Sequence, residues 1–113
     1  MEAYFDILMS RAEMVKNWRK HVMYIAKVVR SFLPNSKIYV FGSVVKGEHT
    51  GGSDVDILIV SKDVPKSNLE KAKIRLRIEE LANLPLYHPF EFHIVNKEEG
   101  EWYFSRIKEL VEF

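Results

Sequence analysis

The chain has 113 residues, of which 47% are hydrophobic and 29% are charged; this balance is typical of one folded domain, residues 1–113, and excludes a disordered chain. Its 17 basic and 16 acidic residues give a net charge of +1, which excludes a strongly basic nucleic-acid-binding protein. The chain has no cysteine, which excludes disulfide bonds, thiolate nucleophiles and cysteine-ligated zinc.

Residues 2–33 are predicted to form one long N-terminal helix, because apolar residues recur at intervals of seven in two adjacent rows. The rows are Leu8, Val15, Val22 and Val29, and Trp18, Ile25 and Phe32. Further apolar residues widen this face, which leaves two interpretations open: the helix lies across a sheet, or part of it docks a partner helix or a second copy of the chain. Charges throughout the first 20 residues argue against a signal peptide or a membrane span, so we expect a cytoplasmic protein.

After Pro34, the pattern predicts a strand, a helical turn, a second strand, a helix, a third strand and a last helix. Their ranges are 37–41, 44–48, 54–60, 67–83, 90–95 and 97–112. Ser67 and Asn96 each precede a glutamate by three residues, which is the spacing of a helix-capping box. We therefore expect an α+β fold, with a small mixed β-sheet and helices packed mainly on one face.

Two neighbouring motifs contain the candidate functional residues. The strand over 37–41 runs directly into Gly42-Ser43, where a glycine lets the backbone approach a ligand closely and the following amides can bind phosphate oxygens. The next strand begins with Asp54 and Asp56, and because strand side chains alternate, both carboxylates project from one face. Two carboxylates side by side repel each other unless a cation lies between them.

Oxygen ligands select hard cations, so the aspartate pair predicts Mg²⁺, with Mn²⁺ as a substitute. Mg²⁺ usually bridges one or two carboxylates to substrate phosphates, so a phosphate-binding turn beside this pair implies a nucleoside triphosphate. A third carboxylate is then expected on a neighbouring strand, and Glu91 is the candidate, because burial of a glutamate between two phenylalanines needs a partner or a metal. The alternative is that Glu91 lies on an exposed sheet face beside His93.

Other motifs do not fit the sequence. Lys46 is followed by Gly47 rather than by the serine or threonine of a Walker A motif, and Ile57 stands where an EF-hand needs a further oxygen ligand. The four histidines show no metal-ligand spacing, and each is interpreted as a surface or partly buried polar residue. Glutamates offset the basic residues of the helix over 67–83, and exposed aromatic neighbours are not evident there, so nucleic acid is not expected as a partner.

Gly42-Ser43, followed after ten residues by the Asp-Val-Asp sequence at 54–56, resembles the signature of the DNA-polymerase-β-type nucleotidyltransferase superfamily. The short chain is similar to the minimal nucleotidyltransferase (MNT) family of that superfamily. This resemblance implies metal-dependent transfer of a nucleoside monophosphate, AMP from ATP, to an acceptor hydroxyl, with release of pyrophosphate. The expected parts of the chain are an N-terminal helix, a catalytic core and a C-terminal helix, over residues 1–33, 37–95 and 97–113.

The same resemblance suggests roles for single residues. Metal binding and catalysis would fall to three carboxylates, Asp54, Asp56 and Glu91. The third of them would also help to deprotonate the attacking hydroxyl. Gly42 and Ser43 would bind the triphosphate. Lys46 either neutralises phosphate or is a solvated lysine, and Ser53 either caps the entry to the strand or contacts the nucleotide.

Members of the MNT family are often encoded beside all-helical HEPN proteins, and several such pairs are toxin–antitoxin systems in which the MNT protein adds AMP to a tyrosine of the HEPN ribonuclease. By this resemblance, we expect a HEPN-type protein as the partner and acceptor, with the N-terminal helix as a docking surface for it or for a homodimer. Two alternatives stay open. One is a catalytically idle module that neutralises a partner by contact, and the other is nucleotidyl transfer to an RNA end or a small molecule such as an aminoglycoside.

Overall fold

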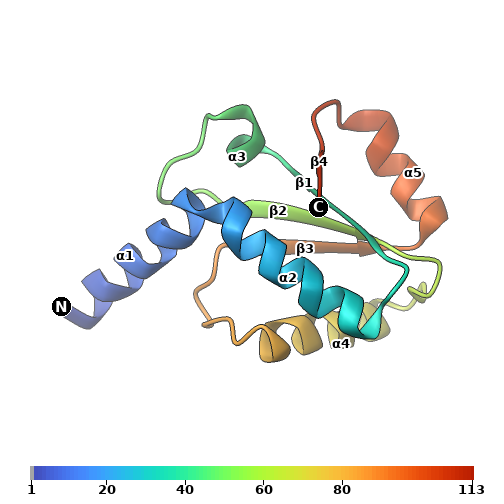
Figure 1. Cartoon of the computed structure of the whole chain (residues 1–113), viewed down its shortest axis with the longest axis horizontal. Coiled ribbons are helices and arrows are strands. Elements are labelled where there is room, and N and C mark those ends of the chain that lie inside the picture. Colours follow the sequence, from blue (N-terminus) through green and yellow to red (C-terminus); the bar gives the residue numbers. More distant parts are fainter. Residues whose placement is uncertain (1) are drawn as a thin grey trace.

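Four strands and five helices make up the part of the chain that the computed structural model describes, residues 2–113 (Figure 1). In chain order they are α1 (Glu2–Lys16), α2 (Trp18–Phe32), β1 (Lys37–Phe41), α3 (Ser43–Lys46), β2 (Val55–Val60), α4 (Asn68–Leu81), β3 (Phe90–Val95), α5 (Lys97–Arg106) and β4 (Val111–Glu112). The strands form one sheet in the order β3-β2-β1-β4, in which β1 is antiparallel to β2 and β4, while β2 and β3 are parallel. The predicted α+β fold with a small mixed sheet is confirmed.

Two of the helices, α2 and α4, cover one face of the sheet, and α5 packs on the other. Val55, Ile57 and Ile59 of β2 are fully buried in the main core, which α2 and α4 cover. The intervening Leu58 and Val60 lie on the opposite face, in a smaller cluster under α5. A glycine in α5 permits this contact, because a Cβ at Gly100 would lie 3.0 Å from Val60 Cγ1. The main core therefore lies on the face of the sheet covered by α2 and α4. The opposite face is covered in part by α5 and also carries polar residues.

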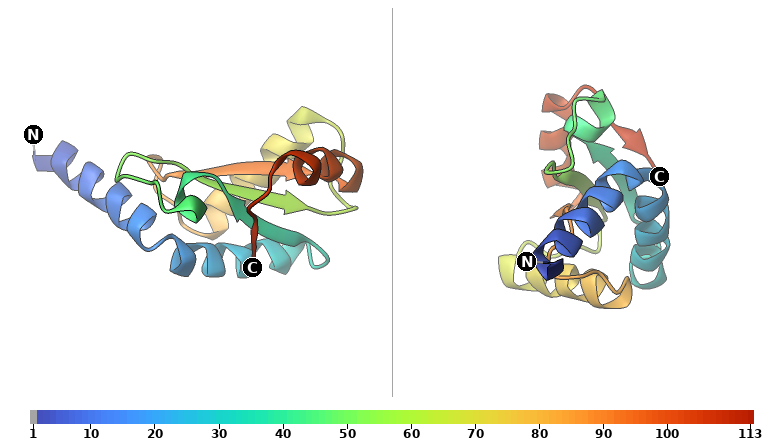
Figure 2. Two further views of the ribbon diagram at one scale, coloured as in Figure 1. Left: turned by 90° about the horizontal axis from the view of Figure 1, so that it is seen from above. Right: turned by 90° about the vertical axis from the view of Figure 1, so that its left-hand side faces the viewer.

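The predicted N-terminal helix is divided into two at Asn17. The backbone there has φ −105° and ψ 35°, outside the helical region, and the side-chain amide donates a hydrogen bond to Glu13 Oε1 (3.1 Å). Asparagine competes with helical structure through such local bonds, which a pattern of apolar residues does not reveal. α2 packs across the sheet, whereas α1 projects from the body of the molecule (Figures 1 and 2).

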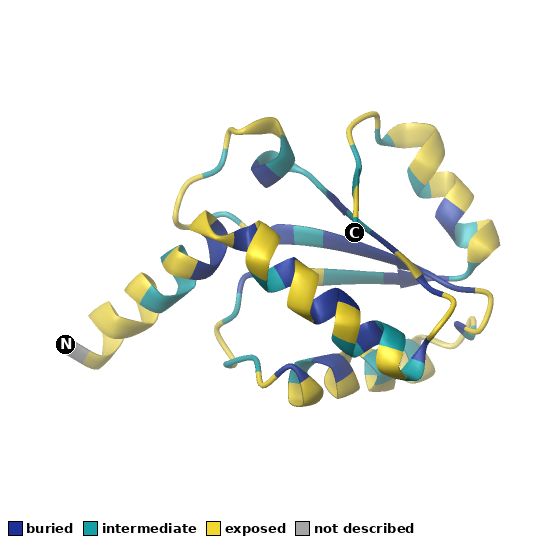
Figure 3. Cartoon of the chain, viewed as in Figure 1, coloured by how far each residue is buried: buried dark blue, intermediate teal, exposed yellow. Residues whose placement is uncertain are grey.

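The N-terminal part of α1 is exposed (Figure 3), and several of its residues are apolar. They are Tyr4, Phe5, Ile7, Leu8 and Met9, all of them exposed. Of the two interpretations of the apolar face, packing across the sheet therefore applies to α2, and docking to a partner stays a prediction for α1. Within residues 2–113, no helix combines the length and the hydropathy needed to cross a bilayer.

The last helix is shorter than predicted, and a strand follows it. α5 ends at Arg106 rather than near residue 112, and Ile107 has an extended backbone (φ −102°, ψ 120°). β4 then pairs with β1, and the Phe113 N–H donates to the Ile38 carbonyl (2.8 Å). This pairing satisfies backbone groups of β1 that β2 leaves free, a tertiary stabilisation that overrides the local helical pattern.

The start of α5 makes stability depend on pH. Asn96 and Glu99 form the predicted capping box, in which each side chain accepts a hydrogen bond from the other backbone N–H (2.8 and 3.0 Å). The bond from the Asn96 N–H and a further bond from Lys71 Nζ (2.6 Å) hold the pKa of Glu99 below its ordinary value of 4.5. Because this pKa is lower in the folded than in the unfolded chain, ionised Glu99 contributes stability above pH 4.5 that is lost as the pH falls through the folded value.

We expect Glu99→Gln to lower the free energy of unfolding at neutral pH by less than about 1 kcal/mol. The amide keeps a bond to the Asn96 N–H and loses the charge that pairs with Lys71, and solvent screens this partly exposed pair. Urea titrations should show that the difference from wild type is constant above pH 4.5 and shrinks as the pH is lowered below 4.5, through the folded pKa of Glu99. Glu98→Gln, in the same turn but exposed, is the control, and an equal pH dependence in both variants would contradict the role of Glu99.

Candidate active site

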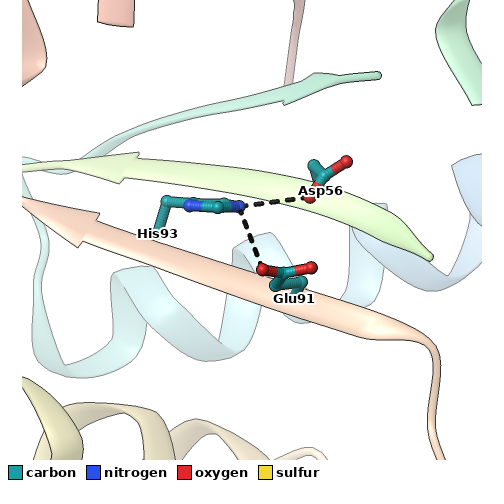
Figure 4. Close-up of side chains that lie close together, drawn as sticks. All are labelled: Asp56, Glu91 and His93. Atoms are coloured by element: carbon teal, nitrogen blue, oxygen red, sulfur yellow. Dashed lines mark hydrogen bonds and ion pairs between the residues drawn. The ribbon is translucent and has the colours of Figure 1, made fainter. Parts of the chain in front are cut away.

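Asp56 and Glu91 lie side by side on the α5 face of the sheet (Figure 4). They are register partners in the parallel pair of β2 and β3, so strand alternation turns both side chains to the same face. Together with His93, they offer ligand atoms that all lie within 4.8 Å of one another. The side chain of Glu91 is 56% exposed, as the alternative interpretation expects, yet it lies beside Asp56, as the functional interpretation requires. The structure thus brings together two of the three predicted carboxylates.

His93 completes this group, although the sequence pattern left it without a role. Its Nε2 lies 3.2 Å from Asp56 Oδ1 and 4.0 Å from Glu91 Oε1, and its Nδ1 lies 3.3 Å from the Tyr103 hydroxyl on α5. One signal was available, because a residue two positions after Glu91 shares its face of the strand. No sequence pattern predicts Tyr103, since α5 meets β3 only in the folded chain.

Tyr103 lies partly buried between α5 and the sheet, against the ring of His93. Burial raises the pKa of its hydroxyl, and the negative charges of Glu99, Glu91 and Asp56 raise that pKa further. The hydroxyl is therefore protonated at neutral pH. It can either donate a hydrogen bond to His93 Nδ1 or accept one from it.

Asp54 lies apart from this group, in the loop that leads into β2. Its Oδ1 pairs with Nη2 of Arg11 on α1 (2.8 Å), and its side chain is 59% exposed. Arg11 Nη1 also donates to the carbonyls of Ser53 (3.1 Å) and Gly51 (3.3 Å), so α1 is fastened to the loop that carries Asp54. The group of ligand atoms around Asp56 does not include Asp54 in this structure, and metal binding by Asp54 stays a prediction.

Gly42 is required where β1 turns into α3. Its φ of 91° and ψ of −158° form a backbone conformation that is essentially restricted to glycine. A Cβ at this position would lie 2.6 Å from Asp56 Oδ2, so the backbone of the turn approaches the carboxylate too closely for any side chain. The close approach in this structure is made to Asp56, and the approach of this backbone to a ligand stays a prediction. Ser43 follows as the first residue of α3.

Lys46 and Ser53, two predicted nucleotide contacts, have different surroundings. Lys46 is exposed at the end of α3 and lines a cavity of about 340 Å³ beside the Gly-Ser turn, together with Arg106 and Lys108. Glu109 also lines this cavity, and three basic side chains against one acidic side chain leave a positive charge that suits an anionic group such as a phosphate. Ser53 Oγ accepts a hydrogen bond from the Thr50 N–H (2.9 Å) and so closes the loop before β2, which matches its structural interpretation.

A larger groove, with a volume of about 830 Å³, opens between α4, α5 and β3. Its lining combines aromatic and basic side chains, among them Phe92, His93, Trp102, Tyr103, Lys71 and Arg75. His93 and Tyr103 belong both to this groove and to the surroundings of the carboxylates. A molecule in the groove would therefore lie next to the carboxylate pair.

The donor set around Asp56 fits a divalent cation. Asp56 and Glu91 carry like charges on adjacent strands, and in residues 2–113 neither of them pairs with a lysine or an arginine. Carboxylates at this spacing repel each other, and a cation between them removes the repulsion. Carboxylate oxygens are also the ligands that Mg²⁺ and Mn²⁺ prefer in proteins. The residues present are thus compatible with the predicted metal site.

Known proteins are similar to this chain in sequence and in fold. A family model described as a nucleotidyltransferase domain matches residues 22–112. The chain is similar to a crystal structure of a protein classified as a nucleotidyltransferase, with 31% sequence identity and a TM-score of 0.65, over 82% of this chain and 97% of that chain.

A second similar crystal structure, from Sulfolobus solfataricus, is classified in the same way. Its sequence is 22% identical, with a TM-score of 0.59 over 96% of this chain and 84% of that chain, so this likeness shows the fold alone. No curated protein matches the chain.

Proposed function

This chain belongs to the nucleotidyltransferase domain family, and from that premise we propose that it transfers a nucleoside monophosphate, AMP from ATP, to an acceptor hydroxyl. The observation that carries the proposal is the register pairing of Asp56 with Glu91, directly beside the backbone of Gly42. A turn that can bind phosphate and a pair of carboxylates suit nucleotide chemistry when they adjoin, because phosphates and carboxylates can share one cation.

The proposed metal ligands are Asp54, Asp56 and Glu91. Mg²⁺ is the expected ion, with Mn²⁺ as its substitute, because carboxylate oxygens prefer both. When bound, the ion would offset the negative charge that develops on the reacting phosphates. Asp54 is available despite its pairing with Arg11, because an exposed ion pair of this kind contributes less than about 1 kcal/mol.

The proposed site for the triphosphate is the turn at Gly42 and Ser43. Lys46 and Arg106 supply positive charge in the adjoining cavity, which favours a polyanion over a neutral ligand. Ser53 shapes the loop next to this turn through its bond with Thr50, and a contact of Ser53 with the nucleotide stays a prediction.

In the reaction, one bond to phosphorus forms and another breaks. The acceptor oxygen attacks the α-phosphorus, the bond from that phosphorus to the bridging oxygen of the β-phosphate breaks, and pyrophosphate leaves with the electron pair. We assign the hydroxyl proton to Glu91, since its side chain is 56% exposed and that of Asp56 is 24% exposed. The basic side chains at the turn stabilise the charge of the leaving pyrophosphate.

We assign the acceptor hydroxyl to a partner protein of HEPN type, which makes this chain the antitoxin of a toxin–antitoxin pair. The exposed apolar side chains of α1 support this assignment, because such a surface is typical of one that another protein covers. A homodimer through α1 is the competing use of the same surface. The groove beside His93 offers an acceptor side chain an approach to the carboxylates.

Transfer of radioactive label tests the proposal. The chain is incubated with a divalent cation, a candidate HEPN protein and ATP that carries ³²P on either the α- or the γ-phosphate. We expect label on the partner from α-labelled ATP alone, because the γ-phosphate departs with pyrophosphate. Label from γ-labelled ATP would indicate phosphoryl transfer instead, and the absence of label from both would contradict this acceptor.

Arg11 is expected to compete with the metal ion for Asp54. We expect Arg11→Gln to increase Mn²⁺ affinity about two- to fivefold, because it frees a carboxylate from an exposed ion pair. The affinity is measured by titration of the electron paramagnetic resonance signal of free Mn²⁺. Arg19→Gln, which removes an exposed arginine stacked on Trp18, is the matched control. A lower affinity in Arg11→Gln would contradict competition.

A further inference from the structure

We infer that His93 is a ligand of the bound cation, so that Asp56, Glu91 and His93 form a mixed nitrogen and oxygen site that prefers a first-row transition-metal ion to Mg²⁺. The inference rests on the proposed function for the presence of a cation. It adds a nitrogen ligand to the proposed carboxylates, and it changes the expected ion, because Mg²⁺ is the ion expected only for a site of carboxylates alone. We call these three side chains the mixed cluster.

All three residues of the mixed cluster lie within β2 and β3, which are neighbours in the sheet, and none of the three lies in a loop (Figure 4). His93 Nε2 points between the carboxylates, 3.2 Å from Asp56 Oδ1 and 4.0 Å from Glu91 Oε1. Ligand atoms that bind one ion at about 2.0–2.2 Å lie roughly 3 to 3.5 Å from one another. The 3.2 Å separation lies within that range and the 4.0 Å separation lies above it, so a rotation of the Glu91 side chain toward His93 is needed to close the cluster around an ion.

The second ring nitrogen of His93, Nδ1, also has a hydrogen-bond partner. The Tyr103 hydroxyl lies 3.3 Å from Nδ1. Metal-binding histidines almost always donate this second N–H to an oxygen, usually of a carboxylate, a backbone carbonyl or water, and the hydroxyl oxygen of Tyr103 can take that place. With Nε2 bonded to Asp56, Nδ1 accepts from the hydroxyl; with Nε2 bound to an ion, Nδ1 carries the proton and donates. A tyrosine hydroxyl serves both states. The ring is confined as well, since it packs against Phe41 and is only 22% exposed.

A nitrogen ligand changes which ion the site prefers. Mg²⁺ favours oxygen ligands, whereas later first-row transition metals bind imidazole more tightly. Asp54, the carboxylate that would make the site all-oxygen, is paired with Arg11. His93 is therefore the third ligand already beside Asp56 and Glu91, and Asp54 would add a further oxygen when its exposed pair with Arg11 opens.

Pulsed electron paramagnetic resonance tests the inference, with Mn²⁺ as the probe and no nucleotide present. Mn²⁺ bound to the wild-type chain should show ¹⁴N modulation from a coordinated imidazole. His93→Gln should remove this modulation, weaken Mn²⁺ binding by about tenfold or more, and reduce the preference for Mn²⁺ over Mg²⁺. Tyr103→Phe should retain the modulation and weaken binding by up to about tenfold, because it removes only the partner of Nδ1.

His21→Gln is the matched control, since His21 lies over the opposite face of the sheet, against Phe90 and paired with Glu13. Its affinity and modulation should equal those of wild type. Oxygen-only coordination of Mn²⁺ in the wild-type chain, or equal affinities in wild type and His93→Gln, would overturn the inference. Nitrogen modulation without any label transfer would overturn the proposed function alone, and label transfer without nitrogen modulation would overturn the inference alone.

Discussion

Asp56→Asn is expected to slow nucleotidyl transfer by about three orders of magnitude. Asp56 contacts the three other parts of the site. It pairs in register with Glu91, lies within hydrogen-bond distance of His93, and lies against the backbone of Gly42. Asparagine has nearly the same shape and no charge, so it preserves the packing and removes an anionic metal ligand. A bound ion stabilises the transition state by several kcal/mol, and about 4 kcal/mol corresponds to a roughly thousandfold change in rate.

The measurement is the initial rate of label transfer from α-labelled ATP, with the melting temperature recorded for each variant. The melting temperature of Asp56→Asn should equal or exceed that of wild type, because the repulsion between two carboxylates is removed. Asp63→Asn is the matched control, since Asp63 is exposed beyond the opposite end of β2, and it should retain full activity. A rate for Asp56→Asn close to that of wild type would show that this carboxylate is not catalytic.

Gly42→Ala is expected to lower the free energy of unfolding by about 3 kcal/mol. Two costs combine: the positive φ of 91° disfavours any side chain, and the new Cβ would lie 2.6 Å from Asp56 Oδ2. Relief of the contact requires the Asp56 carboxylate to rotate away from the turn, which moves its oxygens relative to Glu91. Activity should therefore fall more steeply than stability, as urea titrations and label transfer on the same preparations would show.

Gly47→Ala separates the two costs. Gly47 also has a positive φ, of 73°, but a Cβ there would meet no atom within 4 Å, so a loss of only about 1 kcal/mol is expected. In an Asp56→Ala background, the cost of Gly42→Ala should fall, because the close contact is gone, and it should still exceed that of Gly47→Ala, because φ 91° with ψ −158° is more strained for alanine than the left-handed helical region. An unchanged cost in that background would show that the contact with Asp56 is not its source.

The arrangement of Asp56 and Glu91 could be predicted because it depends on local alternation in two strands. Once β2 and β3 are recognised, the period of two residues places each carboxylate on the polar face, and burial of the intervening residues makes a register slip costly. The same reasoning could have included His93, which shares that face. What local patterns could not supply is the order of the strands, which makes Asp56 and Glu91 neighbours.

Contacts between distant segments account for what the sequence did not predict. Arg11 meets Asp54 across 43 residues, and neither side chain carries a local mark of the other. β4 forms because β1 has a free edge, which overrides the helical pattern near residue 111. The break at Asn17 has a local cause, the bond between the Asn17 side chain and Glu13. The sequence did not predict it, because the rows of apolar residues continue past this position.

The location of the mixed cluster on paired strands has a kinetic consequence. Backbone hydrogen bonds between β2 and β3 set the spacing of the ligands before any ion arrives, so occupation of the site requires no ordering of a loop. The association rate should then depend on how fast the incoming ion exchanges its water, and Mg²⁺ dehydrates reluctantly. Stopped-flow mixing should accordingly find faster entry for Mn²⁺ than for Mg²⁺, with the slower rearrangement confined to Asp54 and its loop.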